Sequence, residues 1–231
     1  MPIAPAQGAA GSAKDRQVMR LFHFTGASYA LQNIEHRRVK IAEIKDLNDP
    51  FDLRAPRLRN ADQRKRWTAW RNDFGRQIGM ICFSPHWKNV TMWSHYADKH
   101  RGICLGFDVD ESIVDDVEYS CDRPEIDFSK RPAESDLQPL LFLKSTDWAY
   151  EQEYRVWTRL ENPVDVGGQQ LYFEPFSEKL KLREIVVGPL CEVTRAQLEP
   201  LLTPYQDKPK LLKARHAFHS FAVVTQQLGL K

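Results

Sequence analysis

The sequence has few cysteines, and none of them forms a C-x-x-C pair. Four occur in 231 residues, at positions 82, 104, 121 and 191. A chain of this length can bury a core without disulfide staples, so we expect reduced thiols and a cytoplasmic location.

Long apolar runs are also absent. No segment approaches the roughly 18 apolar residues of a membrane-spanning helix, so we expect no membrane partner. The first stretch, MPIAPAQGAAGSAKD, is rich in Ala, Gly and Pro and lacks the basic start and apolar run of a signal peptide. We predict a disordered N-terminal tail over residues 1–18 and a single domain over residues 19–231.

Neither a charge excess nor a standard nucleotide-binding loop is present. The 33 basic and 31 acidic residues leave a net charge of +2, which gives no global argument for a nucleic-acid partner. The patterns G-x-x-x-x-G-K-S/T, G-x-G-x-x-G, G-x-S-x-G and H-E-x-x-H do not occur. Their absence argues against P-loop NTPases, Rossmann enzymes, α/β-hydrolases and the commonest zinc proteases.

What the sequence does contain is a series of short strands separated by a few helices. Hydrophobic periodicity predicts a helix over residues 60–76 and a shorter helix that we expect Thr91 to cap. This order indicates an α+β fold with a mixed, mostly antiparallel sheet and flanking short helices. The main strands are expected at residues 20–24, 79–84, 102–110, 154–160 and 181–189.

Potential metal ligands gather in one window of the sequence. Soft and borderline ligands at such density raise a zinc hypothesis. Both cysteines of the window, however, lie inside apolar strands, where a thiol usually acts as a small hydrophobe. We therefore expect no metal, and a zinc-containing structural domain or small hydrolase remains an alternative. The window comprises Cys82, His86, His95, His100 and Cys104, and the zinc ligands of that alternative would be Cys82, His86, His100 and Cys104.

Residues 57–76 combine seven basic residues and two acidic ones with the aromatic residues Trp67, Trp70 and Phe74. Basic and aromatic side chains together are what single-stranded nucleic acids bind. The aromatic spacing of i, i+3 and i+7 is instead typical of a helix face that packs on a core. We favour the packed face, and nucleic acid stays open as a partner.

The sequence EQEYR, residues 151–155, places two carboxylates two positions apart with an arginine just after them. If the following strand extends back to residue 151, Glu151 and Glu153 share one face, roughly 6 to 7 Å apart. Both carboxylates would then enter one site. The alternative is a charged strand end in which Glu153 pairs with Arg155.

Three parts of the chain resemble the ADP-ribosyltransferase fold. LFHFTGASYALQNIEHRRVKIA is similar to its opening strand, which ends in His before a small turn with Thr. GMICFS, MWSHYA and GICLGFDV resemble the strand, short helix and strand of the poly(ADP-ribose) polymerase pattern. EYRVW is similar to the catalytic strand of that family, which opens with Glu. The resemblance implies an ADP-ribosyltransferase-like split sheet.

The chain also resembles a family of uncharacterised bacterial proteins over nearly its whole ordered length. The marks of that family are a first-strand His, N-D-P-F-D, C-F-S, M-W-x-x-Y and W-x-x-E-x-E-Y-R. They correspond here to His23 and to residues 48–52, 82–84, 92–96 and 148–155. The activity of that family is not settled, so the transferase role rests on the first resemblance.

Two departures from the transferase pattern bear on activity. The polymerase-like group carries Tyr where this chain has Cys82, and a thiol cannot stack on nicotinamide as a phenol ring does. Trp93 or Tyr96 would then supply the stacking surface. The E-x-E of residues 151–153 is similar to that of arginine-specific transferases, whose first strand usually carries Arg where this chain has His23.

The resemblance implies that NAD is the substrate and that no metal is needed. Glu153 would stabilise the oxocarbenium-like state formed as the bond to nicotinamide breaks, and Glu151 would orient the acceptor. The other expected contacts are His23 and Thr25 at the adenosine ribose, Ser84, Trp93 and Tyr96 at the nicotinamide, and Arg155 at the Glu153 carboxylate or a phosphate.

The predicted activity is NAD-dependent ADP-ribosyl transfer or NAD glycohydrolysis, in a toxin or defence role. The acceptor is left open between a protein, a nucleic acid and water. The alternative is a non-catalytic nucleotide- or nucleic-acid-binding module on the same fold, which the replacement of Tyr by Cys82 favours.

Overall fold

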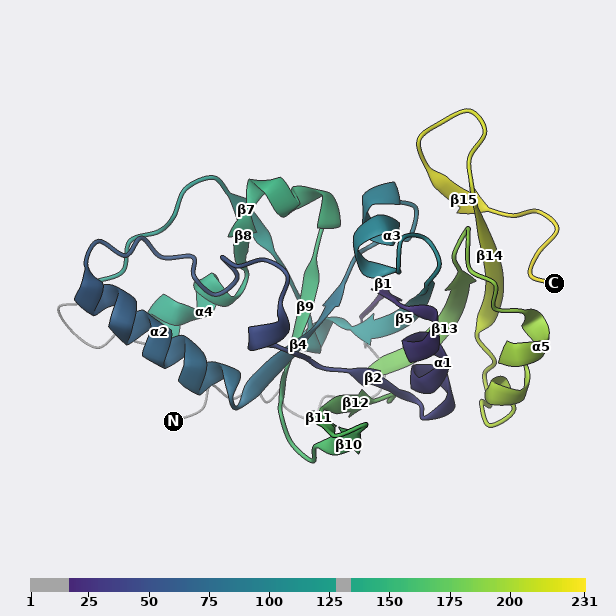
Figure 1. Ribbon diagram of the computed structural model, residues 1–231, viewed down its shortest axis with the longest axis horizontal. Coiled ribbons are helices and arrows are strands. Elements are labelled where there is room, and N and C mark those ends of the chain that lie inside the picture. Colours follow the sequence, from purple (N-terminus) through teal and green to yellow (C-terminus); the bar gives the residue numbers. More distant parts are fainter. Residues whose placement is uncertain (1–16, 128–133) are drawn as a thin grey trace. The chain divides into compact units, whose positions relative to one another are not determined.

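The computed structural model describes residues 17–127 and 134–231, so most of the predicted tail over residues 1–18 lies outside the described residues. Two compact units are present, and each is assembled from separate stretches of the chain (Figure 1). Of the described residues, unit 1 comprises 40–81, 112–127 and 134–173. Unit 2 comprises 17–39, 82–111 and 174–231.

Unit 2 is built on a five-stranded sheet in the order β1-β5-β13-β14-β15. β1 (Val18–Thr25) and β13 (Leu180–Val187) pair antiparallel with β5 (Ile103–Asp110), which is buried over almost its whole length. β14 (Lys210–His216) runs parallel to β13 and forms an antiparallel hairpin with β15 (Val223–Thr225). The apolar run of β5 thus reflects a central strand covered on both faces.

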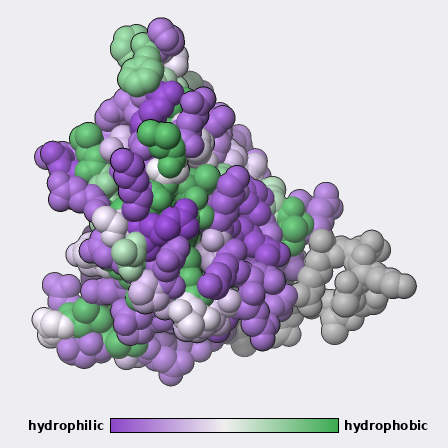
Figure 2. Space-filling model, turned by 90° about the vertical axis from the view of Figure 1, so that its right-hand side faces the viewer, coloured by the Kyte–Doolittle hydropathy of each residue, from purple (hydrophilic) through white to green (hydrophobic). Residues whose placement is uncertain are grey.

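The loop of the β14–β15 hairpin carries two highly exposed aromatic side chains, Phe218 and Phe221. Hydrophobic residues stand at the protruding tip of the surface in Figure 2. The same unit contains short helices: α1 (Ala27–Glu35), α5 (Arg195–Leu198) and the 3-10 helix η4 (Pro200–Leu202).

The helix α3 (Val90–Tyr96) starts two residues earlier than its sequence suggests. The side-chain oxygen of Asn89 accepts hydrogen bonds from the backbone N–H groups of Thr91 at 2.8 Å and Met92 at 3.4 Å. The prediction that Thr91 caps this helix is therefore wrong, because the preceding asparagine already satisfies the first free N–H groups.

Unit 1 contains a four-stranded sheet in the order β3-β4-β9-β6. Its strands are β3 (Ala42–Glu43), β4 (Ile78–Phe83), β9 (Tyr154–Arg159) and β6 (Asp115–Asp116), and the last two residues of β4 count with unit 2. β7 (Glu118–Ser120) runs parallel to β8 (Leu143–Ser145), and β10 (Val164–Val166) forms a hairpin with β11 (Gln169–Leu171).

The predicted helix over residues 60–76 is confirmed as α2 (Ala61–Gly75). Trp67 is buried in a cluster with Leu137 and Leu140 of α4 (Glu134–Leu141), and Trp70 stacks on Phe74 with ring centroids 5.3 Å apart. The aromatic face therefore packs inside unit 1, as the i, i+3, i+7 spacing indicated. It is not an open stacking surface.

The predicted fold class is confirmed: the chain is α+β, with mostly antiparallel strands and a few short helices. Within the described ranges, no helix is long and apolar enough to cross a membrane. The remaining short elements are β2 (Arg38–Lys40), η1 (Ile44–Asp46), η2 (Glu111–Ile113), η3 (Thr146–Glu151) and β12 (Phe173–Pro175).

Candidate functional site

A 3-10 turn, and not a strand, carries the chain to the two predicted catalytic carboxylates. The turn η3 ends at Glu151, Gln152 follows with a left-handed φ of 46°, and β9 begins only at Tyr154. The prediction that Glu151 and Glu153 share one face of a strand is therefore wrong. The turn is capped at its start by the side chain of Ser145.

Both carboxylates nevertheless meet the same cation. The Nζ of Lys144, in the middle of β8, donates to Glu151 Oε2 at 2.6 Å and to Glu153 Oε2 at 3.0 Å. The three side chains are each 4% exposed. Charges buried this deeply persist only when they are paired and hydrogen-bonded, which this arrangement provides.

Arg155 joins the same carboxylate to the N-D-P-F-D turn. Its guanidinium donates to the two oxygens of Glu153 at 2.8 and 3.1 Å, and to the two oxygens of Asp52 at 2.9 Å each. Its Nη1 also donates to the carbonyl oxygen of Leu141 at 2.8 Å. Only the planar, five-donor arginine fork can make this set of contacts. We name Asp52, Lys144, Glu151, Glu153 and Arg155 the buried ion cluster.

The electrostatics of the buried ion cluster follow from burial and mutual contact. Burial raises the pKa of Asp52, although Arg155 acts in the opposite direction. Burial also works against the ammonium of Lys144, but the charges of Glu153 and Glu151 outweigh it and raise its pKa. Lys144 is therefore a cation at neutral pH.

Tyr119 of β7 completes the surroundings of Glu153. Its hydroxyl oxygen accepts a hydrogen bond from the backbone N–H of Glu153 at 2.7 Å. Burial raises the pKa of Tyr119 to about 12, so the phenol is neutral at physiological pH. The backbone of Glu153 is thus held in place independently of its carboxylate.

In unit 2, His23 is fixed by a neighbouring strand. Its Nδ1 lies 3.0 Å from the carbonyl oxygen of Cys82, so we assign the ring proton to Nδ1 and the lone pair to Nε2. Burial lowers the pKa of His23, which keeps the ring neutral near pH 7. A neutral ring in this tautomer presents Nε2 as a hydrogen-bond acceptor.

The two aromatic residues expected at nicotinamide differ in their surroundings. Trp93 is fully buried, its ring meets Phe24 edge-on with centroids 5.3 Å apart, and its indole N–H donates to the carbonyl of Trp87 at 2.6 Å. Tyr96 is partly exposed. Of the two, Tyr96 is therefore the residue whose ring a ligand can reach without displacing core side chains.

Two polar residues of the predicted set also lie in unit 2. Ser84 is buried, and its backbone exchanges two hydrogen bonds with Phe22, at 2.8 and 2.9 Å. Thr25 is partly exposed at the end of β1, opposite Ile103. The structure thus groups the predicted residues by unit: Glu151, Glu153 and Arg155 in unit 1, and His23, Thr25, Ser84, Trp93 and Tyr96 in unit 2.

Sequence reasoning missed two members of the buried ion cluster. Asp52 is the last residue of the N-D-P-F-D motif, so a signal for it was present in the sequence. Lys144 had none, since an isolated lysine beside an apolar run is usually exposed. Among residues 17–127 and 134–231, no group of three or more His, Cys, Asp or Glu is placed to hold a metal ion.

The comparison with known protein families identifies one part of the chain. Residues 92–156 match the family described as "Protein of unknown function (DUF2971)". This segment is similar to an uncharacterised family. The matched range includes Lys144, Glu151, Glu153 and Arg155 of the buried ion cluster, but not Asp52. No curated protein and no solved structure matches the chain.

Proposed function

We propose that the chain binds NAD and breaks the bond between nicotinamide and ribose, passing ADP-ribose to an acceptor or to water. The observation that carries this proposal is the charged setting of Glu153, whose two oxygens contact Arg155 and Lys144. Such contacts favour the carboxylate over the carboxylic acid. A carboxylate is the group that stabilises an oxocarbenium-like ribose as nicotinamide departs.

The other predicted residues take the binding roles in this proposal. His23, with Nε2 as an acceptor, suits a ribose hydroxyl, and Thr25 follows on the same strand. Tyr96 is assigned to nicotinamide stacking and Ser84 to the nicotinamide side, with Trp93 supporting them from the core. Glu151 is assigned to the acceptor.

The acceptor class and the biological setting belong to the same proposal. The exposed Arg64, Lys65 and Arg66 of α2 favour a nucleic acid over a protein as acceptor. A cytoplasmic toxin or defence role would fit a chain that modifies nucleic acid with NAD as the donor.

A second candidate is a non-catalytic nucleotide-binding module, and one observation favours it. The Glu153 carboxylate is 4% exposed and accepts three N–H bonds from Arg155 and Lys144. A carboxylate bonded in this way stabilises the fold, and its charge is already balanced by neighbouring cations. Under this interpretation NAD binds and is released intact.

Nicotinamide release from NAD decides between these candidates. Purified protein is incubated with NAD, with and without cell extract as a source of acceptors, and nicotinamide is measured by chromatography. The wild type should release nicotinamide, and Glu153→Gln should lower the rate by about 10²- to 10³-fold, as expected for the loss of one electrostatic contact to the transition state.

Glu151→Gln is the matched control, because it makes the same chemical change at the other carboxylate on Lys144. It should reduce transfer to the acceptor and leave hydrolysis to water. Thermal unfolding of both variants shows whether each still folds, since removing a buried charge partner is destabilising. If Glu153→Gln and Glu151→Gln lose nicotinamide release and thermal stability to the same extent, both residues are structural.

A pair of substitutions at His23 tests binding separately from turnover. His23→Asn keeps a donor near the Nδ1 position, which bonds the Cys82 carbonyl, and removes the Nε2 acceptor. We expect it to fold and to bind NAD more weakly in calorimetry. NAD binding that depends on His23 without any nicotinamide release supports the non-catalytic module. A folded wild type that binds no NAD contradicts the proposal.

A further inference from the structure

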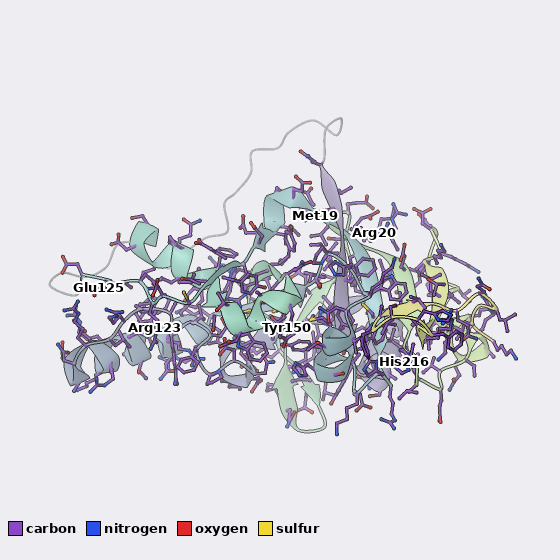
Figure 3. All side chains as sticks on the ribbon, turned by 90° about the horizontal axis from the view of Figure 1, so that it is seen from above. Met19, Arg20, Arg123, Glu125, Tyr150 and His216 are labelled. Atoms are coloured by element: carbon purple, nitrogen blue, oxygen red, sulfur yellow. The ribbon has the colours of Figure 1, made fainter. Side chains whose placement is uncertain are left out.

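Two histidines from distant parts of the sequence meet in unit 2. The Nδ1 of His100 lies 3.3 Å from the Nε2 of His216, and the ring centroids are 4.9 Å apart. His100 follows α3. His216, which is labelled in Figure 3, is the last residue of β14. Neither residue has a role in the proposed reaction with NAD.

The hydrogen bonds behind His100 fix which of its nitrogens carries the proton. The hydroxyl of Ser94 donates to the carbonyl oxygen of Val90 at 3.1 Å, so its single proton is used there. Ser94 Oγ lies 3.0 Å from His100 Nε2 and must therefore accept the N–H of that nitrogen. The lone pair of His100 is then on Nδ1, the atom that faces His216.

The two facing nitrogens are within hydrogen-bond distance of each other, and two ligands on one metal ion have the same separation. Two imidazole nitrogens at 2.0–2.1 Å from a tetrahedral zinc ion are roughly 3.3–3.4 Å apart. The chain from His100 through Ser94 to the Val90 carbonyl is also the kind of outer contact that orients a metal-binding histidine. We propose that His100 and His216 bind one divalent transition-metal ion, Zn²⁺ or Cu²⁺, with water at the remaining positions.

This site differs from the cysteine and histidine window that the sequence singled out. Of that window only His100 takes part, and its partner comes from a hairpin 116 residues further along. The loop before His100 is strained, since Asp98, Lys99 and His100 have φ values of 45°, 51° and 73°. A metal ion would tie this loop to the end of β14 and hold it in that conformation.

Metal titration of protein without an affinity tag tests the proposal. Calorimetry with Zn²⁺ and with Cu²⁺ should show one ion per chain, with Cu²⁺ bound more tightly. His100→Ala and His216→Ala should each abolish this binding. His36→Ala is the matched control, because His36 is exposed like His216 and its loss should leave binding unchanged.

Ser94→Ala tests the outer contact without removing a ligand. It should weaken binding by about 10- to 100-fold, the usual effect of losing a group that orients a metal-binding histidine. Electron paramagnetic resonance of the wild type with one equivalent of Cu²⁺ gives a readout that needs no variant and should show two nitrogen ligands. Binding that survives both alanine substitutions, a spectrum without nitrogen ligands, or no binding by the folded wild type would each overturn the proposal.

Discussion

Each unit contains a group of interlinked charges, and the two groups differ in their exposure to water. In the buried ion cluster of unit 1 every side chain named is at most 4% exposed. The second group lies on one face of the sheet of unit 2, where Arg20 and Arg183 both contact Asp108, at 2.8 and 2.7 Å, with exposed fractions of 21–36%. We name Arg20, Asp108, Lys181, Arg183, Glu184 and Asp207 the surface ion network.

Similar distances therefore have different energetic consequences. Water can replace a lost partner in the surface ion network, so each exposed pair contributes about 0.2–1 kcal/mol. No water replaces a lost partner in the buried ion cluster, and the remaining charge keeps its full desolvation penalty. Distance alone does not distinguish the two groups, whereas solvent access does.

The largest expected effect is at Asp52. Asp52→Ala removes the two hydrogen bonds that the buried guanidinium of Arg155 donates to the Asp52 carboxylate. The free energy of unfolding should fall by about 3–5 kcal/mol. Asp108→Ala in the surface ion network should cost about 0.2–1 kcal/mol. Urea unfolding of both variants measures the difference. Equal losses would show that solvent access does not set the strength of these contacts.

A smaller effect is expected in the coupling between Lys144 and Glu151. Once Lys144→Met has removed the cation, Glu151→Gln no longer breaks an ion pair, so the double variant should lose less than the sum of the single losses. The difference should be about 0.5–3 kcal/mol in a double-mutant cycle by urea unfolding. The same cycle with Lys181→Met and Asp207→Asn, an exposed pair 2.8 Å apart, should show a clearly smaller coupling.

The two groups should also respond to pH with opposite signs. Burial alone would raise the pKa of Asp108, but hydrogen bonds from Arg20 and Arg183 outweigh it and lower that pKa below 3.8. Its contribution to stability is thus present above pH 3.8 and is lost as the pH falls through the lowered pKa. The stability defect of Asp108→Asn should accordingly disappear at acid pH.

For Asp52 the sign is reversed, because burial raises its pKa above 3.8. The contribution of this group to stability is then full below pH 3.8 and declines as the pH rises through the raised pKa. The defect of Asp52→Asn relative to the wild type should be largest at acid pH. Urea unfolding of both variants across the acid range measures the two trends, and trends of the same sign would contradict this account.

The smallest expected effect is that of salt. The Debye length falls to about 3 Å in 1 M salt, which screens exposed charges and leaves buried ones nearly unaffected. The defect of Asp108→Asn should shrink between low and high salt, while that of Asp52→Ala should not change. Unfolding curves at the two ionic strengths provide the comparison, and a salt-sensitive Asp52 would mean that water reaches the cluster.

The sequence predicted those parts of the fold that depend on local patterns. The long apolar run of β5 predicted a buried strand, and both faces of β5 are covered. The aromatic spacing of α2 predicted a packed helix face, and that face packs inside unit 1. The cap of α3 was misplaced by two residues, since Thr and Asn compete for the same N–H groups. Such competition is decided by local geometry that a residue pattern does not contain.

The surroundings of Glu153 were predictable only in part. Its contact with Arg155, two positions away, was foreseen, and the structure contains it. The contact with Lys144 depends on the turn at Gln152, which brings Glu151 and Glu153 to the same ammonium from different directions. The second set of contacts on Arg155 comes from Asp52, 103 residues earlier, and no spacing rule reveals such a contact.

The interleaving of the two units has a practical consequence for anyone who expresses parts of this protein. A fragment cut to residues 92–156, the range of the family match, would contain β5 without β1 and β13, its neighbours in the sheet. It would also contain Arg155 without Asp52. We expect such a fragment to be insoluble and degraded in cells, so deletions should be planned around the paired strands of each unit.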